Sequence, residues 1–411
     1  MTLREHAGPD VPGVSDDLRR RRFALFALFF VPGVGISSWV TRTPAIRDAL
    51  EASTAQMGLV LFGLSVGSMI GILASGPLVA RLGTRPVIVT GSLSVVVSML
   101  VIGFGALGGL AGVVAVGLAL FGLGMGGGEV ALNVEGADVE RGIGRPVLPA
   151  MHGCFSLGTV VGASLGIALT AGQVSVVGHL VGISVLTLTM FLLVIGRLGP
   201  GLAPARERAG ADSSGAGPDA AAHRPVWRDP TLLLIGAIVL AMAFAEGAAN
   251  DWLPLVMVDG HGFAPAWGSA VYALFAAAMT VGRFCGSWVL DRVSRVNVVR
   301  LSALAGGIGL ALVVFVDSQP VAAAAVVLWG LGASLGFPLA LSAAGDSGEN
   351  PAGRVALVAT LGYVAFLIGP PILGFVGEEH GLRGALVVVL SLVVVAGLLA
   401  PAVRPRDAVA R

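Results

Sequence analysis

The segment Phe121-Gly-Leu-Gly-Met-Gly-Gly-Gly-Glu-Val-Ala-Leu-Asn-Val-Glu135 decides the fold of this chain. It is apolar and rich in glycine around the carboxylate of Glu129, and it leads into a charged turn before a new apolar segment begins near Pro149. A charge at the centre of a bilayer costs about 2.5–3.5 kcal/mol on insertion scales. We therefore interpret the segment as a membrane helix and Glu129 as a candidate functional residue.

The composition of the whole chain supports a membrane protein. Of 411 residues, 55% are hydrophobic and 12% are charged, and the mean hydropathy is +0.91. Soluble domains carry about 25% charged residues. The net charge of +1 gives no reason to expect nucleic acid as a partner. Cys154 and Cys285 stand alone in separate apolar segments, so we expect neither a disulfide framework nor a metal site, and no other cofactor.

Apolar windows of about 20 residues are long enough to span a bilayer as helices, and twelve occur in this sequence. The predicted fold class is an all-α polytopic membrane protein with two bundles of six transmembrane helices. The expected helices lie near 23–40, 56–80, 87–107, 111–135, 147–170, 174–197, 231–255, 266–290, 298–316, 321–344, 355–377 and 383–402.

The distribution of arginine predicts the orientation of these helices, because positive residues favour the cytoplasmic side. With the N-terminus in the cytoplasm, 21 of the 25 basic residues, all arginines, fall on the cytoplasmic side and three fall outside. The expected domains are a cytoplasmic tail over 1–22, a bundle over 23–197, a flexible cytoplasmic linker over 198–229, a second bundle over 230–402 and a tail over 403–411.

A faint internal repeat links the two bundles, because Gly76–Arg85 and Ser287–Arg295 close corresponding helices. Both segments resemble the cytoplasmic loop motif of the major facilitator superfamily. The first departs from it at Ala80, where the family has an aspartate, and the second keeps Asp291 but lacks the two glycines. The resemblance implies the twelve-helix transporter fold, with gating loops that contain Arg81, Arg85, Asp291, Arg292 and Arg295.

A narrower resemblance is to the YbjJ-like branch of bacterial inner-membrane permeases. Glu129 and Glu135 depart from that branch, which usually has an aspartate and an amide there. The resemblance implies a multi-pass protein of the bacterial cytoplasmic membrane with a small-molecule substrate, and we expect a monomer in the lipid bilayer. It rests on Trp39, Arg42, Pro44, Asn133, Glu140–Pro146, His152, Glu246–Gly247, Asp251–Trp252 and Gly362–Pro371.

One candidate site lies at the fourth and fifth predicted helices. Glu129 and Asn133 are spaced i, i+4 and share a helical face, and His152 lies at a matching depth on the antiparallel helix. A carboxylate beside an imidazole could exchange a proton near neutral pH. The alternatives are a static polar pair, or a Glu129 that is held by Arg141 or Arg145.

The seventh helix repeats this spacing with Glu246 and Asn250, and Gly247 and Pro254 could open that helix beside a solute. Asp251 and its neighbour Trp252 lie near the outer end, where anchoring at the membrane interface explains them nearly as well.

Inside the eighth helix, Arg283 needs a partner of opposite charge, and Asp346 is the expected one. Trp39, Tyr272, Phe337 and Tyr363 could stack on a solute, although a single aromatic residue on a membrane helix more often serves packing or the interfacial belt.

The sequence therefore favours a secondary transporter that moves a small polar solute, sugar-like or another organic metabolite, by alternating access coupled to protons. The alternative is a proton-antiport efflux pump for drugs or metabolites. Such pumps usually have a proline after the second glycine of Gly158-x-x-x-Gly162-x-x-x-Gly166, where this chain has Ala163. We do not expect an enzyme, because no convergent catalytic set is recognisable.

Overall fold

The computed structural model describes residues 15–144, 147–203, 226–348 and 351–404, and within these ranges the chain forms helices and turns without a β-strand. Arg4, Arg406 and Arg411 of the expected tails and most of the expected linker lie outside the described residues. So does Arg145.

The first half of the chain contains six long helices and one short helix. The short helix, Thr43–Ala49, follows Arg42 and was not expected from the sequence, because its seven residues carry no apolar window. The elements are α1 (Asp16–Val40), α2 (Thr43–Ala49), α3 (Thr54–Leu82), α4 (Thr84–Leu107), α5 (Ala111–Ile143), α6 (Leu148–Ala171), α7 (Val176–Ile195) and the 3-10 turn η1 (Gly196–Leu198).

The second half has the same succession of long helices, and Pro254 precedes a turn of π-helix in it. Its elements are η2 (Val226–Arg228), α9 (Pro230–Leu255), η3 (Val256–Gly260), α10 (Pro265–Leu290), α11 (Arg295–Phe315), α12 (Gln319–Asp346), α13 (Pro351–Leu399) and η4 (Ala400–Val403).

The described residues contain eleven helices that are long and apolar enough to cross a membrane. The last of them, Gly353–Val403, consists of two helices that meet at a kink at Gly381, where φ is 75°. The predicted fold class is confirmed, with the eleventh and twelfth expected spans on either side of Gly381. The third and fourth expected spans are separated as predicted, because α4 ends at Leu107 and α5 begins at Ala111.

Glycines allow α5 to pack closely against α3 and α4, because hydrogen side chains let helix backbones approach. A Cβ atom on Gly67 of α3 would collide with the carbonyl of Ala119 on α5. On the other side, a Cβ on Gly91 of α4 would lie 2.7 Å from the Gly124 carbonyl and 3.0 Å from the Cα of Gly128. The glycine-rich stretch before Glu129 thus lets α5 pack closely between α3 and α4.

The two halves meet at one end of the molecule. We call this the far end, and the end with residues 199–203 and the α3–α4 turn the linker end. Helix α3 packs against α13, and α6 packs against α10. A Cβ on Gly58 would lie 2.8 Å from the Pro370 carbonyl, and the Ser65 hydroxyl donates to the Phe366 carbonyl at 2.7 Å.

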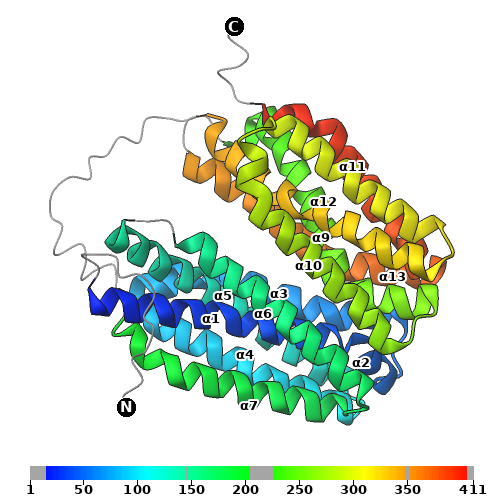
Figure 1. Cartoon of the computed structure of the whole chain (residues 1–411), viewed down its shortest axis with the longest axis horizontal. Coiled ribbons are helices and arrows are strands. Elements are labelled where there is room, and N and C mark those ends of the chain that lie inside the picture. Colours follow the sequence, from blue (N-terminus) through cyan, green and yellow to red (C-terminus); the bar gives the residue numbers. More distant parts are fainter. Residues whose placement is uncertain (1–14, 145–146, 204–225, 349–350, 405–411) are drawn as a thin grey trace, which may run out of the picture.

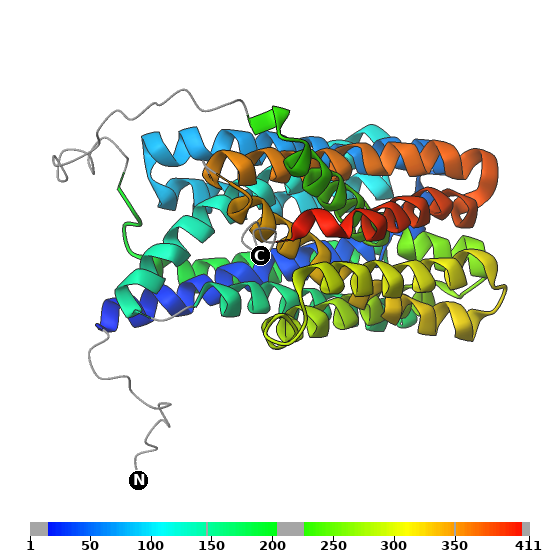
Figure 2. The same cartoon turned by 90° about the horizontal axis from the view of Figure 1, so that it is seen from above.

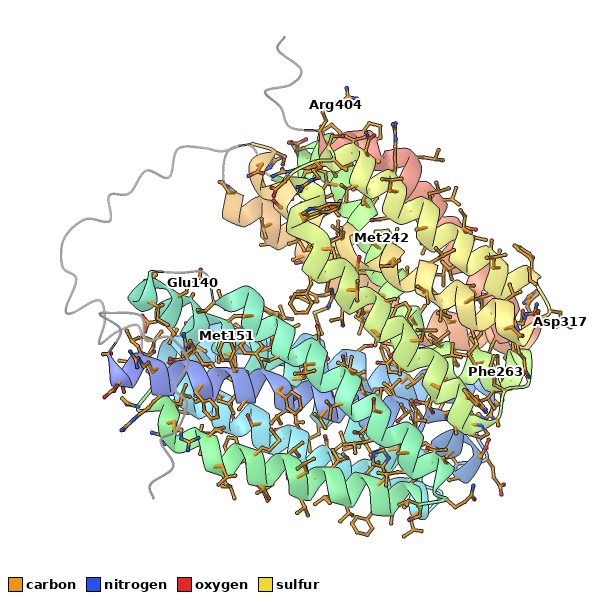
Figure 3. All side chains as sticks on the ribbon, viewed as in Figure 1. Glu140, Met151, Met242, Phe263, Asp317 and Arg404 are labelled. Carbon is orange, nitrogen blue, oxygen red and sulfur yellow. The ribbon has the colours of Figure 1, made fainter. Side chains whose placement is uncertain are left out.

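The halves diverge toward the linker end. In Figure 1 the first half lies below the second, and the two bundles meet at the right and separate toward the left. Most helices of both halves run along the length of the molecule when it is seen from above (Figure 2). At the linker end, Glu140 of the first half and Arg404 of the second lie well apart (Figure 3).

The close contact of α3 with α5 leads to a prediction about stability. Gly67→Ala should destabilise the protein by about 1–3 kcal/mol, because the added methyl group meets backbone that cannot move freely. Gly76→Ala on the same helix is the control, because nothing lies within 4 Å of its Cβ position and alanine favours a helix over glycine. Thermal unfolding of both purified variants in detergent measures the difference; equal midpoints would contradict the proposed close packing.

Candidate functional site

Glu129, Asn133 and His152 lie together on α5 and α6 as the sequence predicted, but their bonding differs from the expectation. The Asn133 amide nitrogen donates to the backbone carbonyl of Glu129 at 3.0 Å. Its amide oxygen lies 2.9 Å from His152 Nε2, so the ring donates from Nε2 to Asn133. The imidazole is thus bound to the amide, and the Glu129 carboxylate has no hydrogen-bond or ion-pair partner within the described residues.

The suggested restraint of Glu129 by Arg141 is not observed, and Arg145, the other suggested partner, lies outside the described residues. Arg141 instead contacts Asp138, one turn away on the same helix, with Nη2 3.4 Å from Oδ1. Arg141 is three turns further along α5 than Glu129, at the exposed end of the helix, which explains why the two do not meet.

A small recess of about 30 Å³ lies beside Glu129, between α1, α4, α5 and α6. Glu129 and His152 supply its ionisable groups, and the Phe29 ring packs edge-on against the imidazole at a centroid distance of 5.0 Å. The other lining residues are apolar, glycine or serine: Leu28, Phe29, Val31, Pro32, Gly91, Ser92, Val95, Gly124, Met125, Gly128, Leu132 and Phe155.

In the second half, Arg283 of α10 pairs with Glu246 of α9, with Nη2 2.8 Å from Oε1. The expected pairing of Arg283 with Asp346 is therefore wrong. Asp346 binds Arg295 at 2.7 Å instead. Arg295 is twelve residues beyond Arg283, at the same linker end as Asp346, whereas Arg283 and Glu246 both lie inside their helices.

Glu129, Asn133 and His152 of the first half face the Glu246–Arg283 pair of the second half across the space between the halves. The charge of Arg283 acts on Glu129 and on His152, and that of Glu246 acts on Glu129. The Glu129 charge in turn reaches Tyr363 on α13. Although each lies deep in its helix, Glu129, His152 and Arg283 are all exposed. We call Glu129, His152, Glu246, Arg283 and Tyr363 the central cluster.

The remaining candidates on α9 and α1 lie closer to the far end and are more buried. Asn250 accepts a hydrogen bond from the Tyr272 hydroxyl at 3.4 Å. Asp251 is 7% exposed and Trp39 is 1% exposed, so Trp39 is part of the core where the halves meet.

The sequence suggested that helix α9 could open at Gly247, but the helix is regular there. It continues through Gly247, which lies against the Phe366 ring, and the irregular turn begins only after Pro254.

Polar contacts that the sequence did not predict close the far end. Arg47 of α2 binds Asp259 of the second half, and Ser269 donates to the Thr41 carbonyl at 2.9 Å. Burial alone lowers the pKa of Arg47, but its hydrogen bonds with Asp48 and Asp259 outweigh this and raise it. The signal in the sequence was weak, because both partners lie in short helical segments between spans, where charged residues are common.

A second unpredicted contact at the far end joins Arg42 and His179. The Arg42 Nε donates to His179 Nδ1 at 2.8 Å, and both side chains are buried. Burial lowers the pKa of the Arg42 guanidinium.

The predicted gating residues at the linker end are partly engaged. Arg85 donates to the Gly199 carbonyl at 2.7 Å, and Arg292 stacks on Trp288 with the guanidinium carbon 4.4 Å from the ring centre. Arg81 and Asp291 are exposed, and Asp291 has no hydrogen-bond or ion-pair partner in the described parts of the chain.

Glu135 is the linker-end residue that sequence reasoning underestimated. Its carboxylate is fully buried and contacts Arg21 at 2.6 Å, Thr84, and the Leu202 backbone nitrogen at 2.6 Å. The run of arginines in the first turns of α1 could have suggested such a partner. No group of three or more His, Cys, Asp or Glu residues suited to a metal ion occurs among the residues searched, which are the described ones.

The described residues form twelve apolar helices when the two that meet at Gly381 are counted separately, and a charged cluster lies between the two halves. This arrangement is that of a secondary membrane transporter. The family model of the Major Facilitator Superfamily matches residues 24–362. The chain belongs to this superfamily.

Relatives and solved structures agree with this assignment. An uncharacterized MFS-type transporter of Yersinia pestis is 30% identical over 388 residues, which cover 94% of this chain and 95% of that protein. The membrane protein MosC of Rhizobium meliloti is 26% identical over 89% of this chain and 86% of its own length.

Among solved structures, a variant of the nucleoside transporter NupG superposes with a TM-score of 0.72 at 16% identity, over 93% of this chain and 98% of that one. A bacterial homologue of the lysosomal transporter Spinster, in an inward-facing and unoccupied conformation, gives 0.70 at 14% identity, over 96% and 98% of the chains. At these identities the likeness concerns the fold.

The Glu246–Arg283 pair gives a prediction about stability. Glu246→Gln should lower stability by about 1.5–3 kcal/mol, because it removes the charged acceptor of the Arg283 hydrogen bond. The matched control is Asp346→Asn, which breaks the pair with Arg295 at the linker-end surface and should cost about 0–1 kcal/mol. Thermal unfolding in detergent compares the two variants. If Asp346→Asn lost as much stability as Glu246→Gln, the larger contribution expected of the central pair would be refuted.

Proposed function

We propose that this protein is a proton-coupled secondary transporter of a small polar solute, with the central cluster as its binding and coupling site. The observation that carries the proposal is the state of Glu129. It is a carboxylate that has no bonded partner in the described parts of the chain and lies well inside α5, next to Arg283, which pairs with Glu246.

This arrangement favours a reversible proton on Glu129. With Glu129 and Glu246 ionised and Arg283 charged, the cluster carries one excess negative charge, and an uncompensated charge inside a membrane protein is costly. A proton on Glu129 removes the excess. His152 is bound to Asn133 next to the same recess and is placed to pass that proton toward the linker end.

The arrangement of the halves supports alternating access. The contacts of Arg47 with Asp259 and of Thr41 with Ser269 hold the far end closed, whereas the halves diverge at the linker end (Figure 1). Movement of one half against the other about the central cluster would exchange these two conditions. Arg85, Asp291, Arg292 and Arg295, with Arg81, are proposed to close the linker end in the alternative state.

We further propose that the linker end faces the cytoplasm of a bacterial cell, that the membrane is the inner membrane, and that the protein acts as a monomer. The arginine distribution supports this orientation. Membership of the YbjJ-like branch stays a prediction, and so do the boundaries of the two bundles.

Glu129→Gln tests the coupling. In proteoliposomes, with a solute first identified by thermal-shift screening of metabolites at two pH values, this variant should lose uphill accumulation but keep exchange between equal solute pools. The reason is that glutamine keeps the shape of the side chain but cannot bind and release a proton. Gly76→Ala, purified and reconstituted in the same way, is the control and should keep both activities. Active, pH-dependent accumulation by Glu129→Gln would remove Glu129 from the mechanism and favour Glu246.

The orientation has its own test. Single cysteines placed at Ser213 in the linker and at Gly384 near Arg383 should react oppositely with a membrane-impermeant thiol reagent, in a background where Cys154 and Cys285 are replaced by serine. We expect labelling at position 384 from outside intact cells and labelling at 213 only after the cells are opened. Labelling of position 213 in intact cells would reverse the proposed orientation.

A further inference from the structure

The charges around Glu129 are unbalanced in a way that bears on what the site can bind. Arg283 is the cation of the central cluster, and its guanidinium is already within 2.8 Å of Glu246. Glu129 is exposed and carries the remaining negative charge without a bonded partner among the described residues. A solute that adds a negative charge would face Glu129, whereas one that adds a positive charge would complete the balance.

The recess beside Glu129 has the chemistry of a pocket for a small cation. Its volume of about 30 Å³ has room for about two water molecules, or for one small polar head group. The rings of Phe29 and Phe155 line it together with the Met125 side chain. Aromatic faces attract cations through the electron density of their rings, and a carboxylate adds a charge-assisted hydrogen bond.

No charged group in the recess opposes a cation. Glu129 and His152 are its ionisable lining residues, and the ring of His152 is engaged with Asn133. Helices α1, α3 and α4 also pack around α5, but their charged side chains in the described residues lie in the terminal turns of these helices at the linker end. Across the space between the halves stand Glu246, Arg283 and Tyr363, and the first two neutralise each other.

We propose that this recess binds the protonated amine end of the transported solute, so that the amine and the coupling proton compete for the Glu129 carboxylate. The inference rests on the proposed function and narrows its solute to polar compounds with a cationic amine. Ionised Glu129 binds the ammonium group more tightly than neutral Glu129 does, so protonation of Glu129 favours its release. A glutamine at this position weakens binding but still permits exchange between saturating solute pools. Each half-cycle then carries either one ammonium solute or one proton, and the charge of the cluster is the same in both.

Three small probes that differ at one end isolate the effect of charge: ethanolamine, ethylene glycol and glycolate. They present a cationic, a neutral and an anionic end on the same two-carbon frame. Thermal unfolding of the purified full-length protein is measured with each probe at matched ionic strength. We expect ethanolamine to raise the unfolding midpoint increasingly with concentration, and the other two to leave it unchanged.

The dependence on Glu129 is tested with two variants. Glu129→Gln should weaken the ethanolamine effect by about tenfold or more, as expected for loss of a hydrogen bond to a charged group. Asp346→Asn removes a carboxylate at the linker-end surface and should keep the wild-type response. Lowering the pH should weaken the response of the wild type and leave Glu129→Gln unaffected.

The outcomes separate this inference from the proposed function. Stabilisation by glycolate, an unchanged ethanolamine response in Glu129→Gln, or no response to any probe would overturn the amine site. The measurement uses no proton gradient and no transport, so a positive result stands even if the coupling experiment fails. Conversely, proton-coupled transport of a neutral solute would leave the proposed function intact and exclude the amine.

Discussion

The ion pair of Glu246 and Arg283 is the interaction on which the centre of this protein depends. A guanidinium inside a membrane bundle must have a partner, because its transfer from water is costly. Glu246 supplies that partner at 2.8 Å from the neighbouring helix. Since Arg283 is paired within the second half, Glu129 of the first half has no bonded partner among the described residues.

The free carboxylate in turn depends on how α5 is packed. Gly124 and Gly128 bring its backbone against Gly91 of α4, and the same helix lies against α3 through Gly67. This close packing fixes one face of α5 within the first half, so the face with Glu129 and Asn133 is directed to α6 and the space between the halves. The glycine-rich sequence before Glu129 thus explains its position.

Much of the fold and part of the site could be predicted from the sequence. Apolar windows marked the spans because a bilayer requires them, and Glu129, Glu246 and Arg283 stood out as charges inside such windows. The predicted partner of Arg283 was wrong, because residue spacing gives the depth of a side chain along its helix but not the neighbouring helix that it faces. Contacts such as Arg47 with Asp259 could not be predicted, since the two residues lie in short helical segments of different halves that only the docking of the halves brings together.

At the linker end, polar contacts hold each half together, although the first half lacks the aspartate of the family's loop motif. The first half has Ala80 where the family has an aspartate, and the buried Glu135 ties α1, α4 and the start of the linker together through Arg21, Thr84 and Leu202. In the second half, Asp229 binds Arg354 at 2.6 Å.

These ties stay within their halves. Burial alone raises the pKa of the Asp229 carboxyl, but hydrogen bonds from Arg354 and from the first backbone amides of α9 hold it below its usual value, so the pair persists at neutral pH. Because Glu135 and Asp229 each bind partners of their own half or of the adjoining linker segment, the proposed movement of one half against the other leaves these bonds in place and changes the contacts between the halves.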